Sequence, residues 1–182
     1  MRNLLLLIAT AACLCISSAA FGQCTPVDHA NDDLRALNAF WRTSIPICQI
    51  APGSRNAYAD RRRGVVWADQ SWLDEQAYRY GTWAATGILA HEWGHMVQGD
   101  VQGTAAELQA DCLAGVFMRG VGLPWQTVEQ FAQANFFAGD AEWSLGGHGT
   151  GVQRVTAARR GYYGYAGQGS VALFALCPLS AF

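Results

Sequence analysis

Apolar residues recur at helical spacing near the start of the chain. Leu34, Leu37 and Trp41 fall three or four positions apart, which predicts a helix over residues 31–42 with one buried face. Short, mostly apolar runs follow at residues 47–50, 56–59 and 64–68. Their length and their bounding proline, glycine and charged residues predict three short strands.

Longer helical patterns dominate the rest of the chain and predict helices over residues 82–98, 104–119, 124–137 and 150–160. Gly120 is expected to stop the second of these helices, and Pro124 to occupy the first position of the third. Thr150 and Gln153 have the spacing of a capping box. The glycine- and tyrosine-rich segment 161–169 predicts an irregular loop. The fold class expected is therefore helix-rich α+β, with a small N-terminal sheet.

The composition favours one compact domain over residues 23–182. The chain has 182 residues, of which 51% are hydrophobic and 14% are charged, enough apolar surface for a sizeable core. The net charge of −2 gives no electrostatic reason to expect nucleic acid or an anionic membrane as a partner. The chain contains no lysine, which excludes Schiff-base and P-loop chemistry. We expect a monomer.

Residues 1–22 have the order of a secretory signal peptide. Arg2 precedes an apolar run over residues 4–16, and small residues follow up to Gly22. An uncleaved membrane anchor is the alternative, but the apolar run is shorter than the roughly 20 residues a membrane span requires. We therefore expect cleavage after Ala20 or Gly22, no membrane association afterwards, and a secreted or periplasmic protein.

Four cysteines remain after the signal segment: Cys24, Cys48, Cys112 and Cys177. They form no Cys-x-x-Cys pair, so a thiolate zinc site or a redox motif is not expected. In an oxidising compartment two disulfides are the natural expectation. Three connectivities are open; we favour Cys24–Cys48 with Cys112–Cys177, and a free, buried Cys112 is the main alternative.

The strongest chemical signal is the pattern His91-Glu92-Trp93-Gly94-His95 inside a predicted helix. Residues four apart lie on one helix face, so both imidazoles can reach one metal ion. Glu92 lies one position away and can act on a water molecule without being a ligand. Gly94 in the middle of a helix costs about 1 kcal/mol, which indicates that something approaches the backbone closely there.

Glu107 and Asp111 follow on the next predicted helix. Two histidines and one glutamate are a known catalytic zinc set, and Asp111 can orient His91 by accepting its N–H. The alternative for Glu107 is a capping box with Thr104. Burying two imidazoles and Glu92 without a cation is costly, so we favour a metal site. The metal is expected to be zinc, although such ligands also accept other divalent ions.

His148 precedes a predicted helix start in Gly147-His148-Gly149-Thr150. It can stabilise a developing oxyanion as a preorganised donor. Alternatively, it is a loop histidine that helps to cap the helix beginning at Thr150. The sequence leaves both roles open.

Residues 91–98, 107–115 and 148–154 together resemble the bacterial neutral zinc metallopeptidases, a family related to gluzincins, and residues 56–58 with 67–69 are similar to its edge-strand region. The resemblance runs from about Leu37 to Gly161. It implies a zincin-like domain in which His91, His95 and Glu107 hold zinc. It also implies that Glu92 is the catalytic base, that Asp111 supports a ligand and that His148 lies near the substrate.

The sequence thus predicts a secreted zinc-dependent endopeptidase that acts on a peptide or protein substrate. Zinc would activate water and polarise the carbonyl, and the strand at 64–68 would bind peptide by strand addition. Two alternatives remain: a disulfide-stapled binding or inhibitory domain with a structural zinc, and a zinc hydrolase of cell-wall peptide crosslinks.

Overall fold

A computed structural model describes residues 24–27, 30–140, 146–167 and 170–182. The predicted signal segment lies outside these residues. The helices are α1 Asn31–Trp41, α2 Gln70–Tyr80, α3 Thr82–Val97, α4 Thr104–Gly120, α5 Trp125–Ala138, α6 Gly151–Gly164 and α7 Ser170–Leu176. The strands are β1 Ile47–Gln49, β2 Ala57–Asp60 and β3 Val65–Ala68, and a 3₁₀ turn covers Leu179–Ala181. The helix-rich α+β prediction is confirmed.

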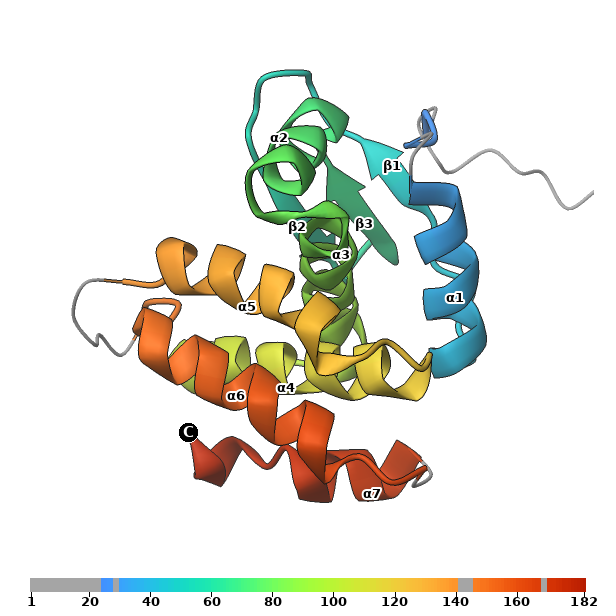
Figure 1. The fold of residues 1–182 in the computed structure, drawn as a ribbon. Helices are drawn as coiled ribbons and strands as arrows, with labels where there is room; N and C mark the ends of the chain where they lie inside the picture. The colour runs from blue at the N-terminus through green and yellow to red at the C-terminus, as the bar shows by residue number, and fades with distance from the viewer. Residues whose placement is uncertain (1–23, 28–29, 141–145, 168–169) are drawn as a thin grey trace, which may run out of the picture.

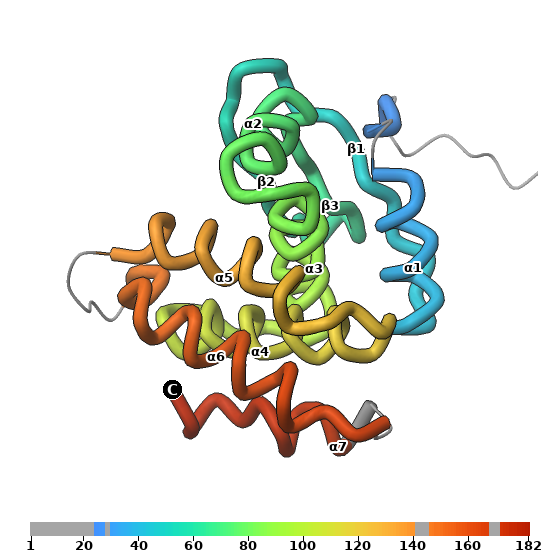
Figure 2. The backbone as a smooth tube through the Cα atoms, in the orientation of Figure 1, coloured from blue at the N-terminus to red at the C-terminus, as the bar shows by residue number. Residues whose placement is uncertain are grey.

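Helix α3 lies at the centre of the fold (Figures 1 and 2). It packs against α4 and α5 on one side and against α2 and β2 on the other. The wholly buried Trp93 anchors it in the core, and its indole N–H donates to Thr43 Oγ1 at 3.1 Å. Further along the chain, α6 packs along α4. The helix that carries both histidines is therefore held on several sides.

Two helices were not expected from the sequence. In α2 only Leu73 and Gln76 are buried, so the helix lacks an apolar stripe. It begins because the side chain of Asp69, its N-cap, accepts a hydrogen bond from the Ser71 backbone N–H. The short helix α7 begins at Ser170, beside undescribed residues, and covers a separate cluster around Leu173.

Several predicted boundaries were wrong. Pro124 is the N-cap of α5, which begins at Trp125. Gly120 belongs to α4, and the left-handed position follows at Gly122, with φ 85°. The predicted loop after residue 160 is helical up to Gly164, because Gly161 serves as a packing site and does not end the helix.

Within the described residues the sheet has three strands in the order β1-β3-β2. β1 is parallel to β3, and β2 is antiparallel to it. The expectation that the 64–68 strand adds a peptide is wrong, because β3 is paired on both sides. Strands β1 and β2 are the two edges of the sheet. The outer side of β1 is bonded to Thr25 and Pro26, whereas no described strand pairs with the outer side of β2. The Asn56 carbonyl oxygen accepts a hydrogen bond from the Asp69 N–H. Along an antiparallel pair, residues alternate between bonding to the partner strand and facing away from it. The backbone groups of Ala57 and Ala59 therefore point away from β3.

Glycines set the closest helix contacts. A Cβ at Gly94 would lie 2.9 Å from Cα of Ala110 on α4, which confirms the expected close approach at this position. Between α4 and α6, a Cβ at Gly161 would collide with the Cys112 carbonyl oxygen, and one at Gly115 with that of Ala158. These backbones touch only because no side chain intervenes.

Both disulfides of the favoured connectivity are present, Cys24–Cys48 and Cys112–Cys177. The alternative of a free Cys112 is therefore wrong. The second bridge joins α4 to the segment after α7 and closes a separation of 65 residues. Disulfides persist in oxidising compartments, which agrees with an extracellular or periplasmic location.

None of the described helices combines the length and the apolar character that a membrane crossing requires.

We predict that Gly161→Ala destabilises the fold by about 1–3 kcal/mol, because the added methyl group must push α6 away from α4. Chemical denaturation followed by circular dichroism measures this change. Gly146→Ala is the matched control, since a Cβ at this position meets nothing within 4 Å. Equal stability of the two variants would contradict the close packing.

Candidate metal centre

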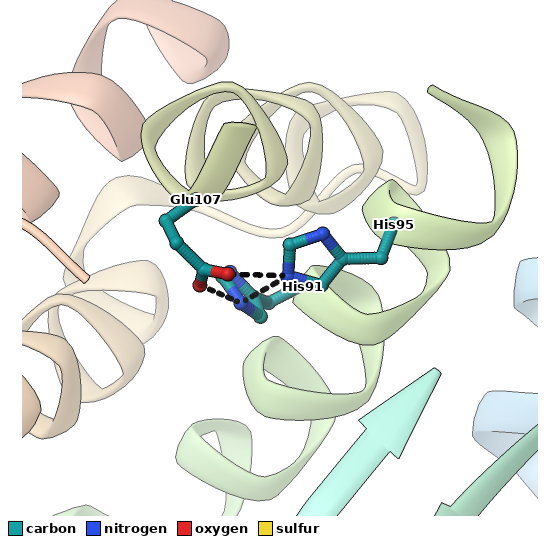
Figure 3. A group of neighbouring side chains, drawn as sticks. All are labelled: His91, His95 and Glu107. Atoms are coloured by element: carbon teal, nitrogen blue, oxygen red, sulfur yellow. Dashed lines mark hydrogen bonds and ion pairs between the residues drawn. The ribbon is translucent and has the colours of Figure 1, made fainter. Parts of the chain in front are cut away.

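Three predicted ligands meet between α3 and α4. His91 and His95 lie on one face of α3, and Glu107 reaches them from the first turn of α4 (Figure 3). The two Nε2 atoms are 3.1 Å apart, and Glu107 Oε2 and Oε1 lie 3.3 Å and 3.4 Å from Nε2 of His91 and His95, respectively. A different carboxylate oxygen of Glu107 therefore faces each imidazole. If one ligand atom is taken from each residue, the three atoms lie within 4.8 Å of one another, and we call this group the ligand triangle.

The spacing of the imidazole nitrogens and the carboxylate is compatible with a shared tetrahedral metal ion. Ligand atoms about 2.0–2.1 Å from zinc in tetrahedral geometry are separated by roughly 3.3–3.4 Å. The 3.1 Å between the two nitrogens, and the 3.3 and 3.4 Å from each nitrogen to the nearest Glu107 oxygen, are close to that separation. Two imidazole nitrogens and a carboxylate oxygen suit zinc and other divalent ions. The group could therefore hold a divalent metal ion.

The capping alternative for Glu107 is wrong. The N-cap of α4 is Gly103, with no side-chain cap. Thr104, the proposed partner, donates its hydroxyl to the Gly147 carbonyl at 2.8 Å. Glu107 is therefore turned toward the histidines, and Thr104 ties α4 to the loop that carries His148.

Asp111 orients His91 through the ring nitrogen that does not face Glu107. It is wholly buried, and its Oδ1 lies 2.7 Å from Nδ1 of His91. Burial alone would raise the pKa of Asp111, but Arg154 and His91 hold it below its usual range. An ionised carboxylate only accepts hydrogen bonds, so Nδ1 of His91 donates to Asp111. In the neutral imidazole this leaves the Nε2 lone pair facing Glu107, as a metal ligand requires.

Two residues that the sequence interpretation missed complete the Asp111 network. Arg154 on α6 donates to both Asp111 oxygens, at 2.8 and 3.0 Å, and Asn135 on α5 donates at 2.6 Å. Arg154 ends the third block of the family resemblance, which was a signal that it belongs to the site. Asn135 had no such signal. The network joins α3, α4, α5 and α6 at one carboxylate.

His95 is also held by a hydrogen bond, to Gln98, which the sequence interpretation missed. Its Nδ1 lies 2.8 Å from Oε1 of Gln98, whose amide donates to the Ala106 carbonyl at 3.0 Å and to Gln109 at 3.1 Å. Gln109 in turn donates to the Cys177 carbonyl at 2.6 Å. The amide oxygen of Gln98 makes Nδ1 the donor, so Nε2 again faces the centre. The spacing of three between His95 and Gln98 was the available signal.

The charges around the triangle favour a cation. Burial would lower the pKa of His91, but Asp111, Glu107 and Glu92 outweigh it and raise the pKa to about 10. Burial would likewise raise the pKa of Glu107, yet the two histidines hold it far below its usual range. Acidic groups thus surround the imidazoles, and a positive charge is stabilised at this point.

Glu92 and His148 line the same cavity as the triangle, a space of about 580 Å³. Glu92 is 8% exposed; burial raises its pKa, although the Ala59 backbone N–H donates to it. His148 is more open, with 61% of its side chain exposed. Thr150 and Gln153 form the cap of α6, so the structure does not require His148 for that role.

Comparison with known proteins adds no relative: no family model, no curated protein and no solved structure matches the chain.

We predict that Glu107→Gln weakens zinc binding at least 100-fold, since it removes the anionic ligand while preserving the shape of the side chain. Competition with a chromogenic chelator measures the affinity. Glu129→Gln, an exposed change on α5, is the matched control and is expected to bind like the unaltered chain. Equal affinity of the Glu107 and Glu129 variants would exclude Glu107 as a ligand.

We also predict that Asp111→Asn costs about 3–5 kcal/mol of stability, because Arg154 is left as a buried, uncompensated charge. Zinc affinity should fall about 10–100-fold, because His91 loses its partner. Denaturation and metal titration measure the two effects separately. Adding Arg154→Gln should recover part of the stability and none of the zinc affinity; recovery of both would show that Asp111 does not orient His91.

Proposed function

We propose that the chain is a secreted zinc-dependent metallopeptidase that resembles the bacterial neutral zinc metallopeptidases. One observation carries the proposal: two histidines and a glutamate, spaced as ligands of a single metal ion, line a cavity together with a buried second glutamate, Glu92. The two disulfides support secretion, because they require an oxidising compartment.

The number of ligands favours catalysis over a purely structural metal. Structural zinc sites use four protein ligands, whereas catalytic sites use three and keep a position open. Among the residues that the structure describes, no fourth His, Cys, Asp or Glu joins His91, His95 and Glu107. This supports a peptidase over a binding or inhibitory domain with structural zinc.

A bound zinc ion would supply a Lewis acid that makes water nucleophilic near neutral pH and polarises the substrate carbonyl. Glu92 takes a proton from the attacking water and passes it to the leaving amine. Its burial raises its pKa, which makes it a better proton acceptor than an exposed carboxylate. The hydrogen bond from the Ala59 N–H partly offsets this rise in pKa.

The outer edge of β2 is the proposed binding site for an extended peptide. Ala57, Tyr58 and Ala59 line the cavity. The outward N–H and carbonyl of Ala57 and the carbonyl of Ala59 can pair with a substrate strand, while the Ala59 N–H donates to Glu92. His148 approaches from the loop before α6, where its ring N–H can stabilise the oxyanion. In this proposal the substrate binds between β2 and the two site helices.

We expect Glu92→Gln to keep zinc and to lower kcat by about 10²–10⁴-fold, because the amide cannot accept the proton. A fluorogenic peptide library and casein measure hydrolysis, with peptidoglycan fragments assayed beside them to detect cell-wall crosslink cleavage. The matched control, Glu129→Gln, should retain full activity. Turnover at the level of the unaltered enzyme in the Glu92 variant would remove Glu92 from the mechanism.

A further inference from the structure

The cavity extends beyond the metal ligands toward α2. Ile88 lies three residues before His91 and four before Glu92, so it continues the site face of α3 by one turn. Helices α2 and α5 wall this end of the cavity, and both pack on α3. Trp72 and Gln76 of α2 and Ala134, Asn135 and Ala138 of α5 line the cavity, together with Ala57 and Ile88. Small alanines on two sides leave room for a substrate side chain.

Gln76 and Asn135 are the polar residues that α2 and α5 contribute to the cavity lining, and the Asn135 amide donates to Asp111. Gln76 is only 9% exposed, yet its carboxamide forms no hydrogen bond with any residue in the described segments. The other buried site amides, Gln109 and Asn135, are both hydrogen-bonded. Fully enclosed side-chain atoms without a partner occur, in the described part, only at the indole nitrogens of Trp41 and Trp67. The Gln76 amide therefore faces the cavity.

A buried amide without a protein partner requires one from elsewhere. Leaving such a group unsatisfied when water is displaced costs on the order of 1–3 kcal/mol. We propose that Gln76 is a specificity-determining residue, and that this end of the cavity selects a glutamine or asparagine side chain of the peptide substrate. The inference rests on the proposed peptidase function and names its substrate class.

The chemistry of the walls favours an uncharged amide. A carboxamide carries a donor and an acceptor in one plane, so Gln76 can form two hydrogen bonds with a second carboxamide. Neither α2 nor α5 contributes a charged residue to the cavity lining, and a charged end would lose hydration without a partner.

An aliphatic side chain of the same size would leave both groups of Gln76 unpaired. Sites built to hydrogen-bond a substrate reject analogues that lack the bonding group far more strongly than apolar pockets reject size variants. Methionine has nearly the shape of glutamine and lacks its amide. It is therefore the informative competitor.

The test uses alanine-rich peptides that differ only at a central position, which carries glutamine, methionine or glutamate. Hydrolysis by the zinc-loaded enzyme gives kcat/KM for each peptide, and product masses locate the cleaved bond. Calorimetry with the Glu92→Gln variant measures equilibrium binding without turnover. We expect about a tenfold to hundredfold preference for the glutamine peptide over the methionine peptide in both measurements.

Gln76→Met should abolish or reverse this preference, because the new side chain offers no hydrogen bond to an amide and packs against methionine. Gln133→Met is the matched control, since Gln133 is exposed on α5 and lies outside the cavity lining. It should keep the preference for glutamine. Two results would overturn the proposal. One is an unchanged preference for the glutamine peptide in the Gln76→Met variant; the other is equal binding of all three peptides to the protein that keeps Gln76.

The two readouts separate this inference from the proposed function. Glutamine-selective binding without any hydrolysis would refute the peptidase proposal and leave the subsite intact. Hydrolysis without glutamine selectivity would refute the subsite and leave the peptidase proposal intact.

Discussion

The close approach of α3 to α4 at Gly94 and Ala110 is the constraint on which the site depends. The ligands come from both helices, so the separation of the backbones decides whether Glu107 reaches the two imidazoles. Gly94 costs about 1 kcal/mol of helix stability, yet any larger residue would force the helices apart. The packing that closes the core between these helices is thus the same packing that assembles the ligand triangle.

Asp111 adds a second constraint, and its energetics indicate why it is present. A buried ion pair such as Asp111–Arg154 often contributes no more stability than well-packed apolar residues would. Its value lies in geometry, because one carboxylate accepts from His91, Asn135 and Arg154 and thereby joins four helices. Gln98 gives His95 matching support through Gln109 and the segment that ends in the Cys112–Cys177 bridge. Each imidazole is thereby held in the tautomer that a ligand needs.

The sequence predicted those features that depend on local pattern. Helical spacing located α3 and α4 and placed His91 and His95 on one face, and the known two-histidine, one-glutamate zinc set pointed to Glu107. The export signal favoured two disulfides, whereas their pairing was a preference among three open connectivities. Features that depend on tertiary packing escaped prediction. Helix α2 has no apolar stripe, Gly161 is a contact site within α6, and Asn135 joins Asp111 from 24 residues away. The resemblance placed residues 56–58 and 67–69 in one edge-strand region, yet peptide binding was expected at residues 64–68, which are the central strand; strand order is not encoded in the strands' own residues.

X-ray absorption at the zinc edge of the zinc-loaded protein tests the central claim most directly, because it identifies ligand atoms without relying on activity. The account predicts one zinc per chain, with two imidazole nitrogens and carboxylate oxygen at about 2.0–2.2 Å, and loss of one imidazole contribution in His95→Ala. A spectrum with sulfur ligands, or one that is unchanged in the His95 variant, would contradict it.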